Sequence, residues 1–374
     1  MHLSKDDRIF YHLAQALAED EQHVSIFSFL ETLKETHANI NICSEDIGKL
    51  NFKQQYKFCR ELLQKNETSV IVCDSPLTAI IASAYRLKHK CKIVYDVTEW
   101  YPSKKNFPNP STGFLFKILK SMLLIFINGI AGVSSNLLTF GEHYKSLPFR
   151  LFFWKKPNFI HYYPDLKYIK SKKPHLIQDE ICLLYSGKFN VDKGINKVIE
   201  VAKLTASKAP NTRIILNLIG FYGSEEDKNL MNKMLVDTPD NLQVKILPYM
   251  EFEAFCEAIS NNDIFLDLRQ KDLENNHCLP IKIFYYLACG RPVIYSDLKS
   301  LKKEVLVENI GLFTDPNNTE EISEKICTYI KNQSLYESDC RNSLQASQEF
   351  YHWERERQIF LDAIHRLTNR TKRS

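Results

Sequence analysis

Helical periodicity alternates with short apolar runs along almost the whole chain. In the first half, the expected helices cover 9–17, 52–63, 77–87 and 115–127, and the expected strands cover 24–27, 69–73, 92–96 and 129–133. In the second half, the expected strands are 181–186, 213–219, 244–247, 264–268 and 292–295, again separated by helices. Consecutive parallel strands need crossover helices between them, so the alternation predicts an α/β fold of doubly wound sheets.

The chain is long enough for two such sheets. Its 374 residues exceed the roughly 100 to 200 residues that one domain usually contains. A Pro- and Lys-rich segment at 164–174 interrupts the alternation and is typical of an interdomain linker. We therefore expect a domain at 1–168, a second at 175–344 and a C-terminal helix with a basic tail at 345–374, with a ligand crevice at the carboxyl ends of the strands.

Composition excludes several classes of protein. A net charge of +4, from 49 basic and 45 acidic residues, argues against a nucleic-acid partner. Ten scattered cysteines without metal spacing predict free thiols and no metal site, and the polar start of the sequence predicts a cytoplasmic protein. The apolar run 121–141 is interrupted by Asn, Gly and Ser residues, which favours a buried helix and strand over a membrane span.

One stretch combines basic and aromatic residues. Between Lys145 and Lys173 there are eight Lys or Arg and a single Asp165, interleaved with aromatic side chains. Cations with aromatic rings suit the surface of an anionic membrane, which makes Arg150, Lys155 and Lys156 candidates for such a contact and a peripheral location at the inner membrane face an expectation. A solvated charged edge of a strand and linker is the alternative.

Two loops of the second half are candidate phosphate sites. The segment 186–194 joins a strand to a helix and contains Gly187, Lys188, Lys193 and Gly194. Glycine lets a phosphate approach the backbone, while lysines and a helix N-terminus provide positive charge. Gly and Lys are also common in ordinary loops of this kind, so the pattern alone is weak.

A second anion site is expected where the helix of 281–289 opens. Pro280, Ile281 and Lys282 begin this helix, which ends at Gly290, and Gly220 ends an earlier strand. Pro is common at the start of helices and Gly at their end whatever the function, and Lys282 could point to solvent. The hypothesis of an anion site is stronger for the two loops together than for either alone, because both are expected at the carboxyl edge of one sheet.

These segments resemble the donor domain of the family 4, or group 1, glycosyltransferases. Gly187, Lys188, Phe189, Lys193 and Gly194 match the family's first loop, and Pro280 to Val293 match its later helix. The resemblance continues at Gly311-Leu312-Phe313, and more loosely at Asp7-Arg8-Ile9, Tyr95 to Glu99, Tyr163-Pro164-Asp165 and Trp353-Glu354. It implies a GT-B fold of two Rossmann-like domains facing a cleft.

The resemblance also implies an activity. It implies retaining, metal-independent transfer of a hexose from a nucleotide-diphosphate sugar to a lipid-linked or polysaccharide acceptor, with no further cofactor. Lys188 and Lys193, with the helix start near Lys282, would stabilise the leaving diphosphate. The implied donor-binding residues are Gly187, Gly194, Gly220, His277, Pro280, Ile281, Lys282 and Tyr285. The implied acceptor-side residues are Asp7, Thr98 and Glu99.

The sequence departs from the family pattern at several places. The family has two Glu residues eight positions apart, where this chain has His277 and Tyr285. Glu274, or Asp267, could reach the donor instead, although a solvated Glu274 is the alternative. Thr98 and Tyr162 stand where relatives often have His and Asn, and the family's first strand is not found ahead of Asp7, so either the start is misassigned or the fold compensates.

Two other functions remain as alternatives. The replacement of both Glu residues fits a catalytically inactive GT-B accessory protein. A nucleotide-sugar epimerase on the same architecture is a further alternative.

Overall fold

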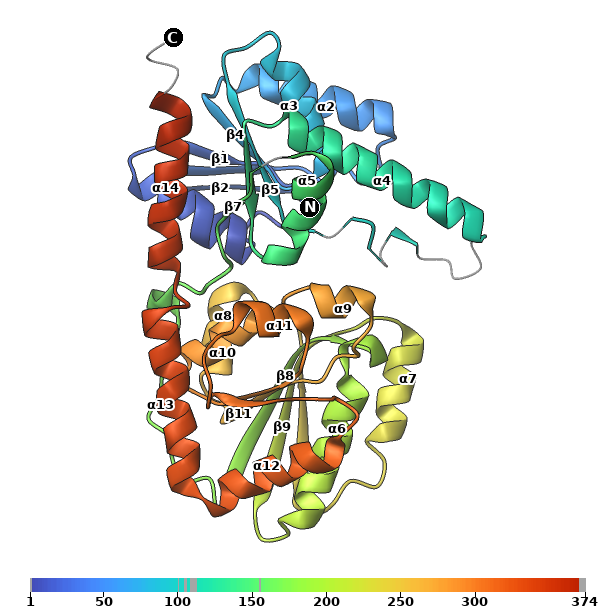
Figure 1. Ribbon diagram of the computed structural model, residues 1–374, viewed down its shortest axis with the longest axis vertical. Helices are drawn as coiled ribbons and strands as arrows, with labels where there is room; N and C mark the ends of the chain where they lie inside the picture. The colour runs from blue at the N-terminus through green and yellow to red at the C-terminus, as the bar shows by residue number, and fades with distance from the viewer. Residues whose placement is uncertain (1, 100, 104–105, 108–112, 155, 370–374) are drawn as a thin grey trace. The chain divides into compact units, whose positions relative to one another are not determined.

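The computed structural model describes residues 2–369 except 100, 104–105, 108–112 and 155 (Figure 1). Contacts divide the chain into two compact units. Unit 1 is Met1–Tyr162 together with Trp353–Ser374, and unit 2 is Tyr163–His352. The boundaries expected from the sequence lie at 168, 175 and 345, whereas the contacts divide the chain at Tyr163 and Trp353. The last helix is therefore grouped with the N-terminal residues.

Unit 2 is built on one six-stranded sheet. Its strands are β8 (Glu180–Phe189), β9 (Arg213–Tyr222), β10 (Leu242–Leu247), β11 (Ile264–Asp267), β12 (Val293–Ser296) and β13 (Gly311–Thr314). The strand order is β10-β9-β8-β11-β12-β13, and every neighbouring pair is parallel. The chain winds outward from β8 in one direction and then returns to β11 to wind in the other. The adjacent strands β8 and β11 therefore mark the point where the winding reverses, where ligands of such sheets bind.

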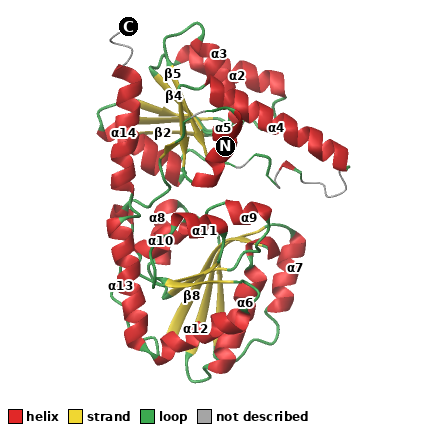
Figure 2. Ribbon diagram, viewed as in Figure 1, coloured by secondary structure: helices red, strands yellow, loops and turns green. Residues whose placement is uncertain are grey.

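Helices cover both faces of this sheet (Figure 2). They are α6 (Ile195–Lys208), α7 (Glu225–Met234), α8 (Phe252–Ile259), α9 (Leu273–His277), α10 (Lys282–Ala288), α11 (Lys299–Glu304), α12 (Thr319–Lys331) and α13 (Gln333–Glu349), with short 3₁₀ turns η3 (Leu166–Tyr168) and η4 (Val191–Lys193). Side chains of α6 and α12 form one apolar core with the sheet, and those of α8 and α10 form the other. This double cover explains the near-continuous apolar strands in the sequence.

Unit 1 contains two smaller sheets. The strands β1 (Val24–Ile26), β2 (Leu33–His37) and β3 (Ile40–Ser44) form one sheet in the order β1-β3-β2. The other sheet consists of β4 (Val70–Cys73), β5 (Lys92–Val97), β6 (Leu137–Phe140) and β7 (Asn158–Phe159), all parallel in this order. Within the described residues no strand joins β1 to β4.

Helices pack on both faces of the β4–β7 sheet. They are the π-helical η1 (Asp7–Ala14), α1 (Gln15–Glu19), α2 (Phe52–Lys65), α3 (Pro76–Arg86), α4 (Phe114–Ser134), α5 (His143–Phe152) and α14 (Trp353–Asn369). One core lies between the sheet and α3, α4 and α5. The other lies between the sheet, η1, α1 and α14. The α/β class expected from the sequence is confirmed, with two Rossmann-like units.

A buried ion pair fixes η1 against the sheet of unit 1. The Arg8 guanidinium donates from Nε to Oδ2 of Asp96 at 3.0 Å and from Nη2 to Oδ1 at 2.9 Å, and Thr139 Oγ1 donates to the same carboxylate at 2.7 Å. The guanidinium also lies 4.3 Å from the ring centroid of Tyr162. Burial alone would lower the pKa of Arg8, but the charge of Asp96 raises it overall, so this pair stays charged.

The expectation for 121–141 was wrong in two respects. One continuous helix, α4, covers Phe114–Ser134, so 129–133 is not a strand, and the strand of this region is β6 at Leu137–Phe140. Most of α4 is exposed rather than buried. Gly129 and Gly132 do not break the helix because they leave room for neighbouring rings: an added Cβ would lie 1.9 Å from Phe153 Cζ and 2.4 Å from Phe149 Cε1.

Two smaller differences concern strands and the C-terminal helix. The antiparallel pair of β2 and β3 was not expected, since β2 reads Leu-Lys-Glu-Thr-His and has no apolar face. The expected helix of about 345–367 is divided into the end of α13 and the separate helix α14. The ten cysteines are free thiols, as expected.

We expect the Arg8–Asp96 pair to be essential for the stability of unit 1. Replacing Arg8 by Leu leaves the Asp96 carboxylate buried without its cation, which should cost about 3–5 kcal/mol. Urea denaturation followed by circular dichroism measures the loss. The double variant Arg8→Leu with Asp96→Leu should regain much of it. Equal destabilisation of the single and double variants would contradict this account of the pair.

Candidate active site

The carboxyl ends of β8 and β11 bring the two predicted phosphate loops together. Strand β8 continues through Gly187 and Lys188 to Phe189, so these residues lie at the strand end and not in a free loop. Gly187 has a φ of +147°, which glycine adopts without strain. A Cβ at Gly187 would lie in ordinary van der Waals contact, 3.5 Å from Tyr185 Oη and 4.0 Å from Lys282 Nζ. The Lys282 amine, from the start of α10, therefore lies close to the Gly187 backbone at the end of β8.

Gly194 holds the first loop against the end of β11. The residue has a left-handed φ of +80°, and it follows the short turn η4 that Asn190 caps by accepting from the Lys193 N–H at 3.0 Å. An added Cβ would lie only 2.0 Å from the carbonyl oxygen of Leu268. Only glycine permits this approach, which places Lys193 beside the loop that follows β11.

Lys193 is bound into a network with Asn275. Its Nζ donates to Asn275 Oδ1 at 2.8 Å. The amide nitrogen of this buried Asn donates in turn to the carbonyl oxygens of Gln270 at 2.9 Å and Asp192 at 3.2 Å. Burial lowers the pKa of Lys193, and the nearby charge of Arg269 lowers it further. An anion bound here would offset both effects.

Arg269 is not available as a second free cation of the site. Its Nε donates to Asp267 Oδ1 at 2.7 Å, and its Nη2 contacts the other oxygen of the same carboxylate. The pair is largely buried at the end of β11. Asp267 is thereby neutralised, so the net positive charge at this edge comes from lysines.

The three lysines of the site differ in their surroundings. Lys188 is exposed, with its Cε 2.1 Å from the position that a Cβ on Gly223 would take. Lys282 is half-buried at the start of α10, after Pro280 and Ile281, and its Nζ lies 5.4 Å from the ring centroid of Phe255. Gly220 pairs with Gly187 in the sheet, and a Cβ added to Gly220 would lie 1.8 Å from the Gly187 carbonyl oxygen.

The residues at the two Glu positions of the family pattern have different environments. His277 ends α9 and is half-buried, and its Nδ1 lies 2.7 Å from the Leu273 carbonyl oxygen, which requires a proton on Nδ1. Glu274 is half-buried on the same helix, and its charge acts on Lys193. Tyr285 is only 2% exposed, and its ring packs edge-on against Phe252.

The acceptor-side candidates lie in unit 1. Asp7 is in the first turn of η1, where its carboxylate accepts from the Arg8 N–H at 2.8 Å. Thr98 and Glu99 follow the carboxyl end of β5, and the Thr98 hydroxyl donates to the Asp74 carbonyl at 3.3 Å. Among the described residues no three His, Cys, Asp or Glu side chains gather as a metal ion requires.

Arg269 and Asn275 belong to the site but were not identified from the sequence. Asn275 lies between the two candidates Glu274 and His277, but an amide carries no charge and stands out little in a polar loop. Arg269 follows the strand of Asp267 at a spacing of two, which was the available signal for their ion pair. The contact of Lys193 with Asn275 joins residues 82 positions apart and is set by the fold.

Replacing Gly194 by Ala should disrupt the site. The added methyl would meet the Leu268 carbonyl, and the left-handed backbone adds about 1–2 kcal/mol of strain. We expect lower thermal stability and displacement of Lys193 from Asn275. Gly113→Ala is the matched control, because no atom lies within 4 Å of its added Cβ. Thermal melts of both variants, with a crystal structure of Gly194→Ala, test the expectation; equal melting temperatures would contradict it.

Comparisons with known proteins concern the second half of the chain and the fold. Residues 168–345, just under half of the chain, match the family model of glycosyl transferases group 1. No curated protein matches the sequence.

Solved structures match over nearly the whole chain. The sucrose-phosphate synthase of Thermosynechococcus elongatus is 15% identical at a TM-score of 0.71, covering 94% of this chain and 90% of that one. WaaG, a glycosyltransferase involved in lipopolysaccharide biosynthesis, is 13% identical at 0.66, covering 94% of each chain. Anabaena HepE in complex with UDP and glucose is 13% identical at 0.64, covering 88% and 86%. The fold of the chain is therefore GT-B, and its second unit is similar to the glycosyl transferases group 1.

Proposed function

We propose that the chain is a glycosyltransferase that takes a hexose from a nucleotide-diphosphate sugar bound at the carboxyl ends of β8 and β11. The observation that carries this proposal is the convergence of Gly187, Lys193 and Lys282 at the reversal point of the sheet. A glycine backbone beside amines favours the binding of a diphosphate. The match of residues 168–345 to glycosyl transferases group 1 supports the same proposal.

The charge of the site fits the leaving group of the reaction. As the bond between sugar and diphosphate breaks, negative charge grows on the phosphate oxygens. Lys188, Lys193 and Lys282 would stabilise that charge, and preorganised charge of this kind is often the largest single contribution to catalysis. We propose that the transfer is independent of metal, needs no cofactor beyond the nucleotide sugar, and retains the anomeric configuration.

Lys193 is the residue best prepared for the transition state. Its amine is held by the Asn275 amide in a partly buried place, so its position costs no reorganisation during the reaction. Its pKa is lowered by burial and by Arg269, and growing charge on a phosphate would be favourable for this desolvated cation. Arg269 and Asp267 neutralise each other and act as positioning residues.

The sugar side of the donor would be recognised from α9. Glu274 and His277 are both half-buried there and lie on the helix that carries Asn275. We propose that the Glu274 carboxylate accepts hydrogen bonds from sugar hydroxyls and that His277 donates or accepts through Nε2. Tyr285 would contact the ribose only after movement of its buried ring.

The acceptor is proposed to bind unit 1. Asp7, Thr98 and Glu99 provide carboxylates and a hydroxyl near the carboxyl end of β5 and the start of η1. Such groups can orient a sugar hydroxyl for attack. A lipid-linked or polysaccharide acceptor, used at the cytoplasmic side of a membrane, is the class we propose. WaaG, to which the fold is similar, is a glycosyltransferase of lipopolysaccharide biosynthesis.

One observation favours an inactive GT-B accessory protein as the second candidate. Both Glu residues of the family pattern are replaced, and the replacement Tyr285 is buried among apolar side chains. A protein of this kind would still bind a nucleotide sugar through the lysines. Binding without turnover would distinguish it from a transferase.

Removal of the Lys193 amine should impair turnover more than donor binding. Lys193→Ala is expected to reduce the rate about a hundredfold or more, because it removes charge aimed at the leaving diphosphate. The measurement is hydrolysis and transfer over a panel of nucleotide sugars beginning with UDP-glucose, with isothermal titration for binding. NMR of the product anomer tests retention.

Lys197→Ala is the matched control, since this α6 lysine pairs with Glu200 at the surface. It should behave as the wild type. Equal rates for Lys193→Ala and wild type would reject the role of Lys193, whereas donor binding with no turnover in the wild type would establish the accessory protein instead.

A further inference from the structure

Helix α4 exposes an apolar surface that the described residues of unit 1 leave uncovered. Of its most apolar 18-residue window, with a mean hydropathy of 1.8, only 17% is buried. The exposed large side chains are Phe114, Leu115, Phe116, Ile118, Leu119, Met122, Leu123, Ile125, Phe126, Ile130 and Val133. We call this set the α4 surface. A soluble domain rarely exposes so large a contiguous apolar patch without a partner.

We propose that the α4 surface inserts into the headgroup region of an anionic lipid bilayer. This inference depends on unit 1 alone and goes beyond the donor site. Where the proposed transfer also holds, it favours a lipid-linked acceptor over a free polysaccharide. The reasons concern length, charge and the neighbouring helix.

The length of the free part of α4 fits insertion better than crossing. Near its C-terminal end the helix is packed into unit 1, where Asn128, Gly129, Ala131 and Gly132 are buried. The 14 residues from Phe114 to Ile127 precede that anchor. At 1.5 Å per residue they reach about 21 Å, which is less than the roughly 30 Å of a bilayer core. A helix held in this way can lie in one leaflet but not span two.

The charges around the helix select an anionic surface. Lys117 and Lys120 lie among the apolar residues of α4. The sequence contains no Asp or Glu between Glu99 and Glu142, and none between Glu142 and Asp165. Basic side chains beside inserted apolar ones are attracted by anionic headgroups, by about 1 kcal/mol for each charge near the surface.

The end of α5 extends the same surface. The ring of Phe153 occupies the space above Gly129, so this end of α5 lies against α4. Its neighbours Leu151, Phe152 and Trp154 are 66%, 72% and 89% exposed. Trp is typical of the boundary between headgroups and acyl chains. Exposed Arg150 and Lys156 belong to this segment, whereas Lys155, expected from the sequence to contact a membrane, lies outside the described residues.

A second copy of the chain is a poorer occupant than lipid. In a twofold dimer the same patch meets itself, which would bring Lys117 and Lys120 against their own counterparts without any acidic residue of α4 to balance them. Anionic headgroups supply that balance. The geometry therefore points to a membrane contact.

Charged substitutions on α4 should abolish vesicle binding. For the double variant Leu119→Glu with Leu123→Glu, we expect the partition onto vesicles of phosphatidylcholine and phosphatidylglycerol to fall at least tenfold, because both side chains are more than half exposed and would be inserted. Co-sedimentation measures the partition. Leu306→Glu, a change at an even more exposed leucine of unit 2, is the control and should bind as the wild type. Lys117→Gln with Lys120→Gln should weaken binding to anionic vesicles only.

Three outcomes would overturn the proposal. Equal sedimentation of wild type and the α4 variant would show that other residues bind the lipid. Resistance of the wild type to alkaline carbonate extraction would show a spanning helix. A wild-type dimer that ignores vesicles and dissociates in the α4 variant would identify a second copy as the partner. Donor binding in the same preparations keeps failure here separate from failure of the proposed transfer.

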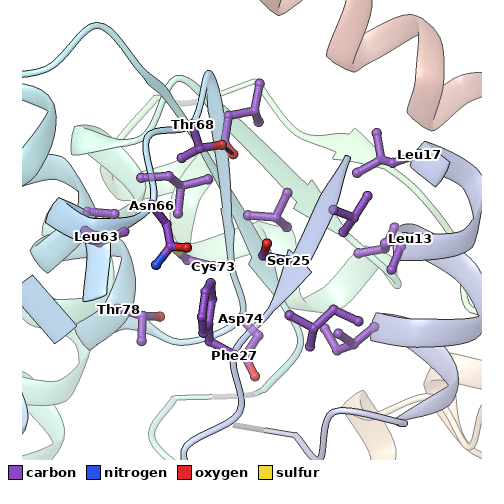
Figure 3. A pocket seen from close by; sticks show the side chains of 18 of the residues that line it. Leu13, Leu17, Ser25, Phe27, Leu63, Asn66, Thr68, Cys73, Asp74 and Thr78 are labelled. Carbon is purple, nitrogen blue, oxygen red and sulfur yellow. Dashed lines mark hydrogen bonds between the residues drawn. The ribbon is translucent and has the colours of Figure 1, made fainter. Parts of the chain in front are cut away.

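Unit 1 also contains a cavity of about 900 Å³ (Figure 3). Its walls include all residues from Val24 to Phe29 and from Ser69 to Asp74, which are β1 and β4 with their flanking residues. Among the described strands, β1 is hydrogen-bonded only to β3, and β4 only to β5. The two sheets of unit 1 thus present strand edges to one cavity.

Discussion

The close contact between Gly194 and the carbonyl of Leu268 determines the candidate site of unit 2. It joins the turn after β8 to the loop after β11, the two strands between which the winding of the sheet reverses. With any side chain at 194 the turn would have to move outward, and Lys193 would lose Asn275. A single missing methyl group thus sets the position of a cation that lies far from Asn275 in sequence. The Lys193 amine is thus held in one position by its hydrogen bond to Asn275.

The sequence predicted the second unit well because local patterns and the fold agree there. Each strand is an apolar run bounded by turn residues, and double helix cover makes that run continuous, so strand ends at Gly187, Gly220 and Asp267 could be placed within a few residues. The pairing of Arg269 with Asp267 and the position of Asn275 depend on where loops meet. Those contacts are tertiary, and spacing along the chain carries little information about them.

The first unit was predicted less well, and α4 shows why. Gly129 and Gly132 read as helix breakers when sequence propensity is considered alone, since each costs about 1 kcal/mol relative to Ala. In the structure the rings of Phe153 and Phe149 occupy the space that larger side chains would take. Packing between helices compensates for the weak propensity, and the helix continues to Ser134. Burial could not be inferred from apolarity either, because apolar residues face either a protein core or a lipid phase.

Unit 1 departs in two ways from the rule that charged side chains are exposed and apolar ones are buried. It buries the charged pair of Arg8 and Asp96, and it exposes the α4 surface. The buried pair is satisfied by hydrogen bonds from Thr139 and to the His161 carbonyl, so its cost is met inside the unit. Among the described residues of the unit, none covers the exposed side chains of α4. The buried ion pair is stabilised by hydrogen bonds within unit 1, whereas the exposed α4 surface needs a partner to cover it. Because this helix is apolar, contains Lys residues and has no acidic residue, it fits the anionic lipid surface that we propose.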